Sequence, residues 1–132
     1  MNQEPPAINE MKSRRGLRRI AGAVRYSFDG LCAAWRNEQA FRQELTLFVP
    51  ATIVALLLPV SPLEKLLLIG VMILALIVEL LNSAIEAVVD RISLERHPLS
   101  KHAKDFGSAA VSLALLLAGL TWAVVLWGML RP

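Results

Sequence analysis

Three long apolar runs dominate the pattern of hydrophobic and polar positions along the chain. Residues 45–63 and residues 106–130 contain no charge, and residues 66–89 are apolar apart from a few polar positions such as Glu79. A bilayer core of about 30 Å is crossed by about 20 apolar residues in helical form. The pattern therefore predicts three membrane-spanning helices, over about residues 40–60, 63–91 and 106–130.

A different periodicity precedes the first span. Apolar residues recur there at steps of three and four, with arginines mostly on the other faces. The apolar positions are Leu17, Ile20, Ala21, Val24, Phe28 and Leu31. This predicts an amphipathic helix over about residues 16–35, either lying in the membrane surface or packing its stripe on the spans. Residues 1–15 are polar, and we expect a loose tail before a single domain over residues 16–132.

Composition and charge agree with a membrane protein. The hydrophobic fraction of 55% and the mean hydropathy of +0.52 are too apolar for a typical soluble domain. The net charge of +3 is a weak argument for a nucleic-acid partner, and we expect none. The basic residues gather before the first span and between the last two, with two spans separating these patches. Because positive charge marks the cytoplasmic side, we expect a cytoplasmic N-terminus and an external C-terminus.

One polar stripe runs down the second predicted span. On a helix that advances about 100° per residue, Glu86 and Asp90 each lie about 20° from Glu79, and Asn82 and Ser83 lie within about 60°. Ionisable residues inside a membrane are costly, so their default interpretation is a functional site. The alternative is that these side chains tie helices together through hydrogen bonds.

The carboxylates near this end of the spans are expected to have two different roles. Glu38 and Glu44, just ahead of the first span, are expected at the same membrane depth as Glu86. Carboxylates in this arrangement suit magnesium, which takes one or two of them together with phosphate oxygens and waters. Glu79 lies about 10 Å from Glu86 along the helix axis, too far to share one metal ion. We therefore expect Glu86 to bind metal and the deeper Glu79 to act as a general base towards an alcohol.

A nucleotide would need a binding site of an unusual kind. The sequence contains no Walker-type phosphate loop and no kinase-like Gly-rich loop. The basic segment of residues 91–104 could meet phosphates, although membrane orientation alone also requires a basic loop there. The single Cys32 cannot form an internal disulfide, and neither it nor the two histidines has a metal-ligand spacing.

Three segments carry a specific resemblance to a known family. Residues 79–91 read Glu-Leu-Leu-Asn-Ser-Ala-Ile-Glu-Ala-Val-Val-Asp-Arg, and residues 103–111 read Ala-Lys-Asp-Phe-Gly-Ser-Ala-Ala-Val. Upstream, residues 33–44 read Ala-Ala-Trp-Arg-Asn-Glu-Gln-Ala-Phe-Arg-Gln-Glu, and Thr121, Trp122 and Trp127 follow later. Together these segments resemble the prokaryotic diacylglycerol kinase family, over nearly everything after about Arg19.

The resemblance implies both a fold and an activity. The fold is an all-α integral membrane protein with three spans and an N-terminal surface helix, assembled as a homotrimer whose active sites are shared between subunits. The activity is transfer of the γ-phosphate of MgATP to the primary hydroxyl of diacylglycerol, which gives phosphatidic acid. The expected location is the bacterial inner membrane, with the C-terminus in the periplasm.

The resemblance also implies residue roles. Glu79 is similar to the proton acceptor and Asn82 to a residue that positions the reacting groups, while Glu38 and Glu86 are similar to the metal ligands. The positions similar to nucleotide contacts are Arg19, Tyr26, Glu38, Glu86, Glu95, Arg96, His97, Lys104 and Asp105. The positions similar to those on the lipid side are Arg42, Glu79, Ser108 and Trp122. Arg96 stands where an aromatic side chain can sit in the family, which weakens its assignment.

Two other functions stay open on the sequence alone. An undecaprenol kinase of the same family would differ in a lipid-facing groove that the sequence does not reveal. A small transporter or proton-conducting protein would use Glu79, Glu86 and Asp90 as a relay down the span. Such a relay would not need Glu38 or an ordered pair such as Lys104 and Asp105.

Overall fold

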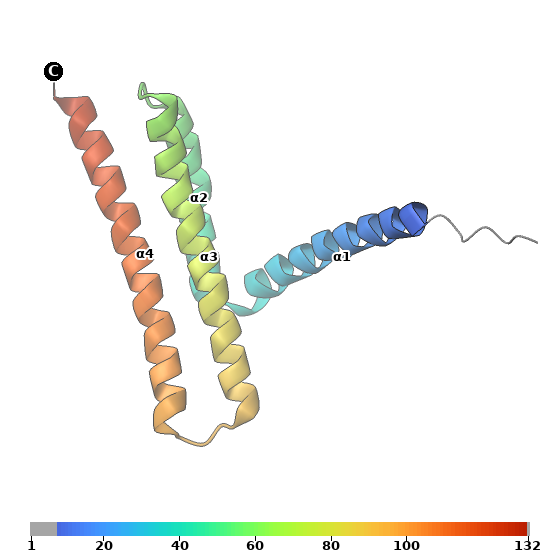
Figure 1. Cartoon of the computed structure of the whole chain (residues 1–132). Coiled ribbons are helices and arrows are strands. Elements are labelled where there is room, and N and C mark those ends of the chain that lie inside the picture. The colour runs from blue at the N-terminus through green and yellow to red at the C-terminus, as the bar shows by residue number, and fades with distance from the viewer. Residues whose placement is uncertain (1–7, 132) are drawn as a thin grey trace, which may run out of the picture. The chain divides into compact units, whose positions relative to one another are not determined.

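The computed structural model describes residues 8–131, which are helical apart from short connections (Figure 1). The helices are α1 (Ile8–Asn37), α2 (Gln39–Leu57), α3 (Pro62–Ile92) and α4 (Pro98–Leu130). Three of them, α2, α3 and α4, are long and apolar enough to cross a membrane, which confirms the three predicted spans. The first 37 residues and those from Glu38 onward form two separate units.

Helix α1 makes up the described part of the first unit and contains the predicted amphipathic stretch. It begins at Ile8, eight residues before the expected start at about residue 16. Of the expected tail, residues 1–7 lie outside the described residues and the remainder is helical. Hydrophobic periodicity does not detect the start of α1 before residue 16, because this polar segment has no apolar residues at helical spacing.

The turn between α2 and α3 is held by side chains at the helix ends. Ser61 is the N-cap of α3, and it exchanges hydrogen bonds with Glu64 in a capping box. Pro62 follows as the first residue of the helix, where its missing N–H is not needed. Lys65 Nζ donates to the Leu56 carbonyl oxygen at 2.7 Å, which satisfies an acceptor at the end of α2. The two helices therefore form a tight antiparallel hairpin.

The connection between α3 and α4 is shorter than predicted. The sequence suggested a basic loop over residues 91–104 and a span beginning near residue 106, whereas α4 begins at Pro98. His97 caps this end, because its Nδ1 accepts a hydrogen bond from the Leu99 N–H at 3.2 Å. Lys101 and Lys104 consequently lie on the first turns of a helix. The early start was missed because it depends on capping and not on hydropathy.

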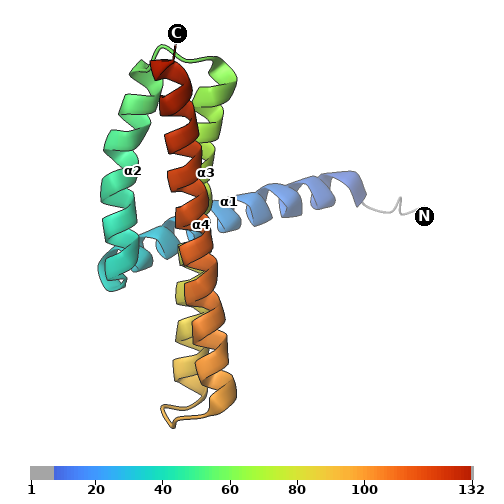
Figure 2. The same cartoon turned by 90° about the vertical axis from the view of Figure 1, so that its left-hand side faces the viewer.

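Helix α3 packs against both α2 and α4, and α3 and α4 run antiparallel (Figures 1 and 2). Ala55 of α2, Leu68 of α3 and Val125 of α4 meet in one buried cluster. Along α4, Gly107, Ala114, Ala118 and Val125 are the buried positions, at intervals of seven, four and seven residues. Small residues at such intervals let two helices approach closely in a membrane.

The lengths of the helices place charged residues at one end of the unit. Helix α3 has 31 residues and α4 has 33, so each is about 46 to 50 Å long, against about 30 Å for the hydrocarbon core. Helix α2 has only 19 residues. In Figure 1, α3 and α4 continue past the start of α2 towards the loop that joins them. We call residues 86–105, which form this extension, the loop end of the unit.

Close packing of α3 on α4 predicts that Ala118→Leu destabilises the protein. Ala118 is 5% exposed, so three added carbon atoms must displace neighbouring side chains at a cost of about 1–3 kcal/mol. The measurement is unfolding by sodium dodecyl sulfate in detergent micelles, followed by circular dichroism. Ala123→Leu, at an exposed position of the same helix, is the control. Equal unfolding curves for the two variants would contradict the packing argument.

Candidate functional site

The polar stripe of α3 lies on the packed side of that helix. Glu79 is 4% exposed although its side chain can carry a charge. Asn82 and Glu86, one and two turns further along, are half-buried, and Asn82 Nδ2 donates to Glu86 Oε1 at 3.3 Å. A buried ionisable group among apolar neighbours is costly, and such groups gather at functional sites. Of the three residues that share a helix face in the sequence, Asn82 and Glu86 are hydrogen-bonded, and the charge of Glu86 acts on Glu79.

The start of α2 adds a carboxylate to this group. Glu38 occupies the N-cap position of α2, but its side chain makes no capping hydrogen bond and is left for other partners. Its charge acts on Glu79, as does that of Glu86. Phe41, in the first turn of α2, is 2% exposed. Glu38 and Glu79 are distant in the sequence and are joined here by the packing of α2 on α3.

Glu44, which the sequence argument grouped with Glu38 among carboxylates that suit magnesium but did not assign as a ligand, is a further candidate site residue. The charge of Glu79 acts on Glu44, and the Glu44 Oε2 atom is buried without a hydrogen-bond partner in the described part of the chain. The signal was available, because Glu44 follows the buried Phe41 by three residues and so lies near the same face of α2. Recognising it required knowing that Phe41 is buried, which the sequence does not reveal.

These oxygen atoms fit a magnesium ion that is shared with phosphate. Within residues 8–131, no three His, Cys, Asp or Glu side chains are placed to hold a metal by themselves. Magnesium rarely requires such a cage, since it keeps waters and binds phosphate oxygens beside one or two carboxylates. Glu38 and Glu86 supply that number, and Asn82 Nδ2 donates a hydrogen bond to Glu86 Oε1 beside them. The chemistry of the donor set therefore suits magnesium.

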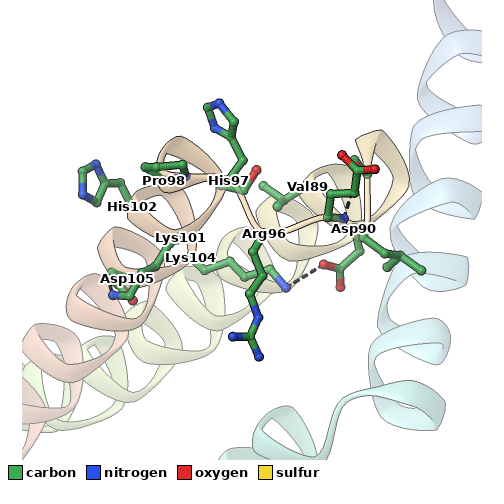
Figure 3. A pocket seen from close by; sticks show the side chains of 13 residues that line it. Val89, Asp90, Arg96, His97, Pro98, Lys101, His102, Lys104 and Asp105 are labelled. Carbon is green, nitrogen blue, oxygen red and sulfur yellow. Dashed lines mark hydrogen bonds and ion pairs between the residues drawn. The ribbon is translucent and has the colours of Figure 1, made fainter.

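A cavity of about 810 Å³ opens at the loop end (Figure 3). It is lined by the end of α3, the connecting loop and the first turns of α4. Five residues with a predicted role at a nucleotide lie in its wall, namely Glu95, Arg96, His97, Lys104 and Asp105. The structure thus gathers most of the predicted nucleotide residues around one space large enough for a small ligand.

Ion pairs organise the wall of this cavity. Lys104 Nζ lies 2.6 Å from Asp90 Oδ1 and joins the first turns of α4 to the last turns of α3 (Figure 3). Lys101 pairs with Asp105 along α4. In Figure 3 the side chains of Arg96 and Lys104 extend to one side of the loop, and that of His97 extends to the other. Arg96 and Lys104 therefore both belong to the wall of the cavity, where phosphate could be met, and Lys104 is paired there with Asp90.

The other predicted residues lie elsewhere. Arg19 and Tyr26 belong to α1, in the separate first unit. Arg42 is half-buried in the first turns of α2, and Ser108 is exposed on α4 just beyond the loop end. Trp122 packs against the cluster of Ala55, Leu68 and Val125. Because fourteen residues separate Ser108 from Trp122, about 21 Å of helix lies between these two lipid-side candidates.

Fold and site together define a small helical membrane protein with buried carboxylates and a charged cavity at one end of its spans. Residues 25–126 match the sequence model of the family described as prokaryotic diacylglycerol kinase, and the chain belongs to that family. The resemblance read from the motifs is thereby confirmed.

Individual relatives agree with the family over most of the chain. A diacylglycerol kinase of Pseudomonas aeruginosa is 59% identical over 117 residues, which cover 89% of this chain and 95% of the relative. A diacylglycerol kinase of Escherichia coli K12 is 53% identical over 112 residues, covering 85% and 92%. A diacylglycerol kinase of Haemophilus influenzae is 42% identical over 117 residues, covering 89% and 99%. The family match itself runs from α1 into α4.

Proposed function

We infer that this protein phosphorylates diacylglycerol with ATP and so makes phosphatidic acid. The observation that carries the inference is membership of the prokaryotic diacylglycerol kinase family, with a relative of that name 59% identical over 95% of its length. The geometry is compatible with this reaction, because a buried carboxylate within the spans lies on the same helix as the wall of a charged cavity. A lipid alcohol and a water-soluble nucleotide need these two environments side by side.

Glu79 is the general base in this proposal. Its carboxylate takes the proton of the primary hydroxyl as the hydroxyl oxygen forms a bond to the γ-phosphorus and the bond from that phosphorus to the β,γ-bridging oxygen breaks. ADP leaves with the bridging oxygen, and no covalent enzyme intermediate is required. Phosphoryl transfer of this kind depends mostly on positioning and on charge stabilisation. The burial of Glu79 supports the assignment, since water is kept from the base.

Glu38 and Glu86 would hold the magnesium ion, with Asn82 beside them. When bound, magnesium neutralises charge on the transferred phosphoryl group. The hydrogen bond from Asn82 to Glu86 orients the carboxylate before any ligand enters. Orientation of this kind by a neighbouring donor is a general feature of metal sites.

The cavity at the loop end would receive the nucleotide. Arg96 and Lys104 are placed to meet its phosphates, and Glu95, His97 and Asp105 complete the wall. Arg19 and Tyr26 of α1 are further nucleotide contacts in this proposal. For the lipid, Arg42 and Ser108 lie near the depth of the carboxylates, and Trp122 lies where acyl chains would run.

The arrangement in the membrane follows from charge. The loop end carries four basic residues, Arg91, Arg96, Lys101 and Lys104, and lysine and arginine mark the cytoplasmic side whatever the net charge, so this end is assigned to the cytoplasm, where ATP is found. The N-terminus is then cytoplasmic and the C-terminus periplasmic, in the bacterial inner membrane. In this orientation α1 lies on the cytoplasmic surface as an amphipathic helix.

A homotrimer with shared sites is part of the proposal. Much of the apolar surface of the spans is exposed in one chain, including large side chains such as Leu113 and Leu116. Lipid can cover such a surface, but so can neighbouring subunits, and three copies can enclose a site that one chain leaves open. Mixing Glu79→Gln subunits with Lys104→Met subunits should restore activity if different subunits complete one site. Failure of every mixture to recover activity would exclude sharing between these residues.

The function is tested with purified protein and ATP labelled at the γ-phosphate. Diacylglycerol and undecaprenol are offered separately in detergent micelles, and the labelled lipid is separated by chromatography. We expect labelled phosphatidic acid, and no comparable product from undecaprenol. Preferential labelling of undecaprenol would reassign the acceptor, and absence of label in both lipids would refute the kinase activity.

The nucleotide cavity predicts a difference between two arginines. Arg96 lines the cavity, whereas Arg91 is not part of its wall, and each substitution by Ala removes one positive charge from the loop end. Arg96→Ala should raise the KM for ATP about fivefold to tenfold and leave kcat within about twofold. The reason is that the lost contact would stabilise bound ATP and the transition state equally. Arg91→Ala is the control and should change KM by less than about twofold. Similar effects of both variants would indicate a general charge effect and not a local contact.

A further inference from the structure

Gly107 of α4 lies directly against Asn82 of α3. It is buried, and a β-carbon at this position would lie 2.1 Å from Asn82 Oδ1 and 3.1 Å from Asn82 Cγ. Contacts of a β-carbon below 3.0 Å are essentially never found, so one of the two groups would have to move. With Asn82 in its observed orientation, residue 107 can only be glycine.

The orientation of the Asn82 carboxamide is set by its other neighbour. Its Nδ2 donates to Glu86 Oε1 at 3.3 Å. An ionised carboxylate only accepts hydrogen bonds, so the amide nitrogen must face Glu86 and the amide oxygen must face the other way. That oxygen is buried without a hydrogen-bond partner in the described residues, beside Gly107. Asn82 is therefore held between a carboxylate on one side and a glycine on the other.

We propose that Gly107 is a positioning residue for phosphoryl transfer, because its lack of a β-carbon allows Asn82 to keep the orientation that donates to Glu86. The inference rests on the proposed function. A methyl group at residue 107 would be accommodated by turning the Asn82 carboxamide, which is the end of a flexible side chain. Turning it breaks the hydrogen bond to Glu86, while the helices keep their places. The consequence is a loss of turnover without a loss of fold.

The contact is particular to this glycine. A β-carbon at Gly70 of α3, or at Gly119 or Gly128 of α4, would meet nothing within 4 Å. Glycine is therefore not required at these positions by contacts within the chain. Gly119, twelve residues further along α4, offers a matched control for the same substitution.

The test compares Gly107→Ala and Gly119→Ala with the wild type in micelles that contain diacylglycerol and MgATP. We expect Gly107→Ala to lower kcat about 10- to 100-fold, which is the scale of losing one hydrogen bond to a charged group. The KM for ATP should stay within about twofold of the wild-type value. Size-exclusion chromatography should show normal assembly. Gly119→Ala should keep wild-type kcat.

A double-mutant cycle with Asn82→Ala separates positioning from a general packing role. If Gly107 acts through Asn82, then Gly107→Ala should cause no further loss of kcat once Asn82 is Ala. Wild-type kcat in Gly107→Ala, a full additional loss in the double variant, or failure of Gly107→Ala to assemble would each overturn the inference. An inactive wild type would instead refute the proposed kinase function on which it rests.

Discussion

Glu79→Gln is expected to lower kcat by roughly 10³-fold, the scale on which a general base contributes to catalysis. The amide has nearly the shape of the carboxylate but cannot take a proton from the lipid hydroxyl. Because Glu79 is buried and the cavity residues lie at the loop end, nucleotide binding should be retained. The measurement is steady-state phosphatidic acid production, together with the binding of a fluorescent ATP analogue.

A matched control exists on the same helix. Glu64 lies at the opposite end of α3, where it caps the first turn, and Glu64→Gln removes the same charge without touching the site. We expect Glu64→Gln to keep wild-type kcat. Turnover by Glu79→Gln within about tenfold of the wild type would remove Glu79 as the base. Loss of nucleotide binding by that variant would point instead to a collapsed site.

Glu86→Gln should show the second large effect, a loss of about 10² in kcat/KM at a fixed magnesium concentration. The carboxylate would no longer offer a negative charge to magnesium, so the concentration of magnesium required for half-maximal activity should rise about tenfold or more. High magnesium should therefore restore part of the activity. This partial recovery distinguishes Glu86 from Glu79, whose loss no metal concentration should repair.

The two variants are best compared in a magnesium titration at saturating ATP and diacylglycerol. Glu64→Gln again serves as the control and should superimpose on the wild type. An unchanged midpoint for magnesium in Glu86→Gln would exclude it as a ligand, and Glu38→Gln would then be examined in the same way. Equal midpoints in all variants would place the metal away from this group of carboxylates.

The sequence by itself determined the features that depend on one helix. The three spans follow from the length of the apolar runs, because a helix of about 20 apolar residues matches the thickness of a bilayer. Glu79, Asn82 and Glu86 fall on one face because a fixed rotation per residue puts them there. Residues 91–104 were expected to be a basic loop, and this was wrong, since capping by His97 starts α4 at Pro98.

Only the tertiary structure decided which residues of different helices meet. Glu38 acts on Glu79, and Glu79 on Glu44, because α2 packs against α3. The contact of Gly107 with Asn82 depends on the register of α4 against α3. Hydrophobic periodicity gives the face that a helix presents but not its axial position against a neighbour, and that position is set by the fit of small residues along the packed face.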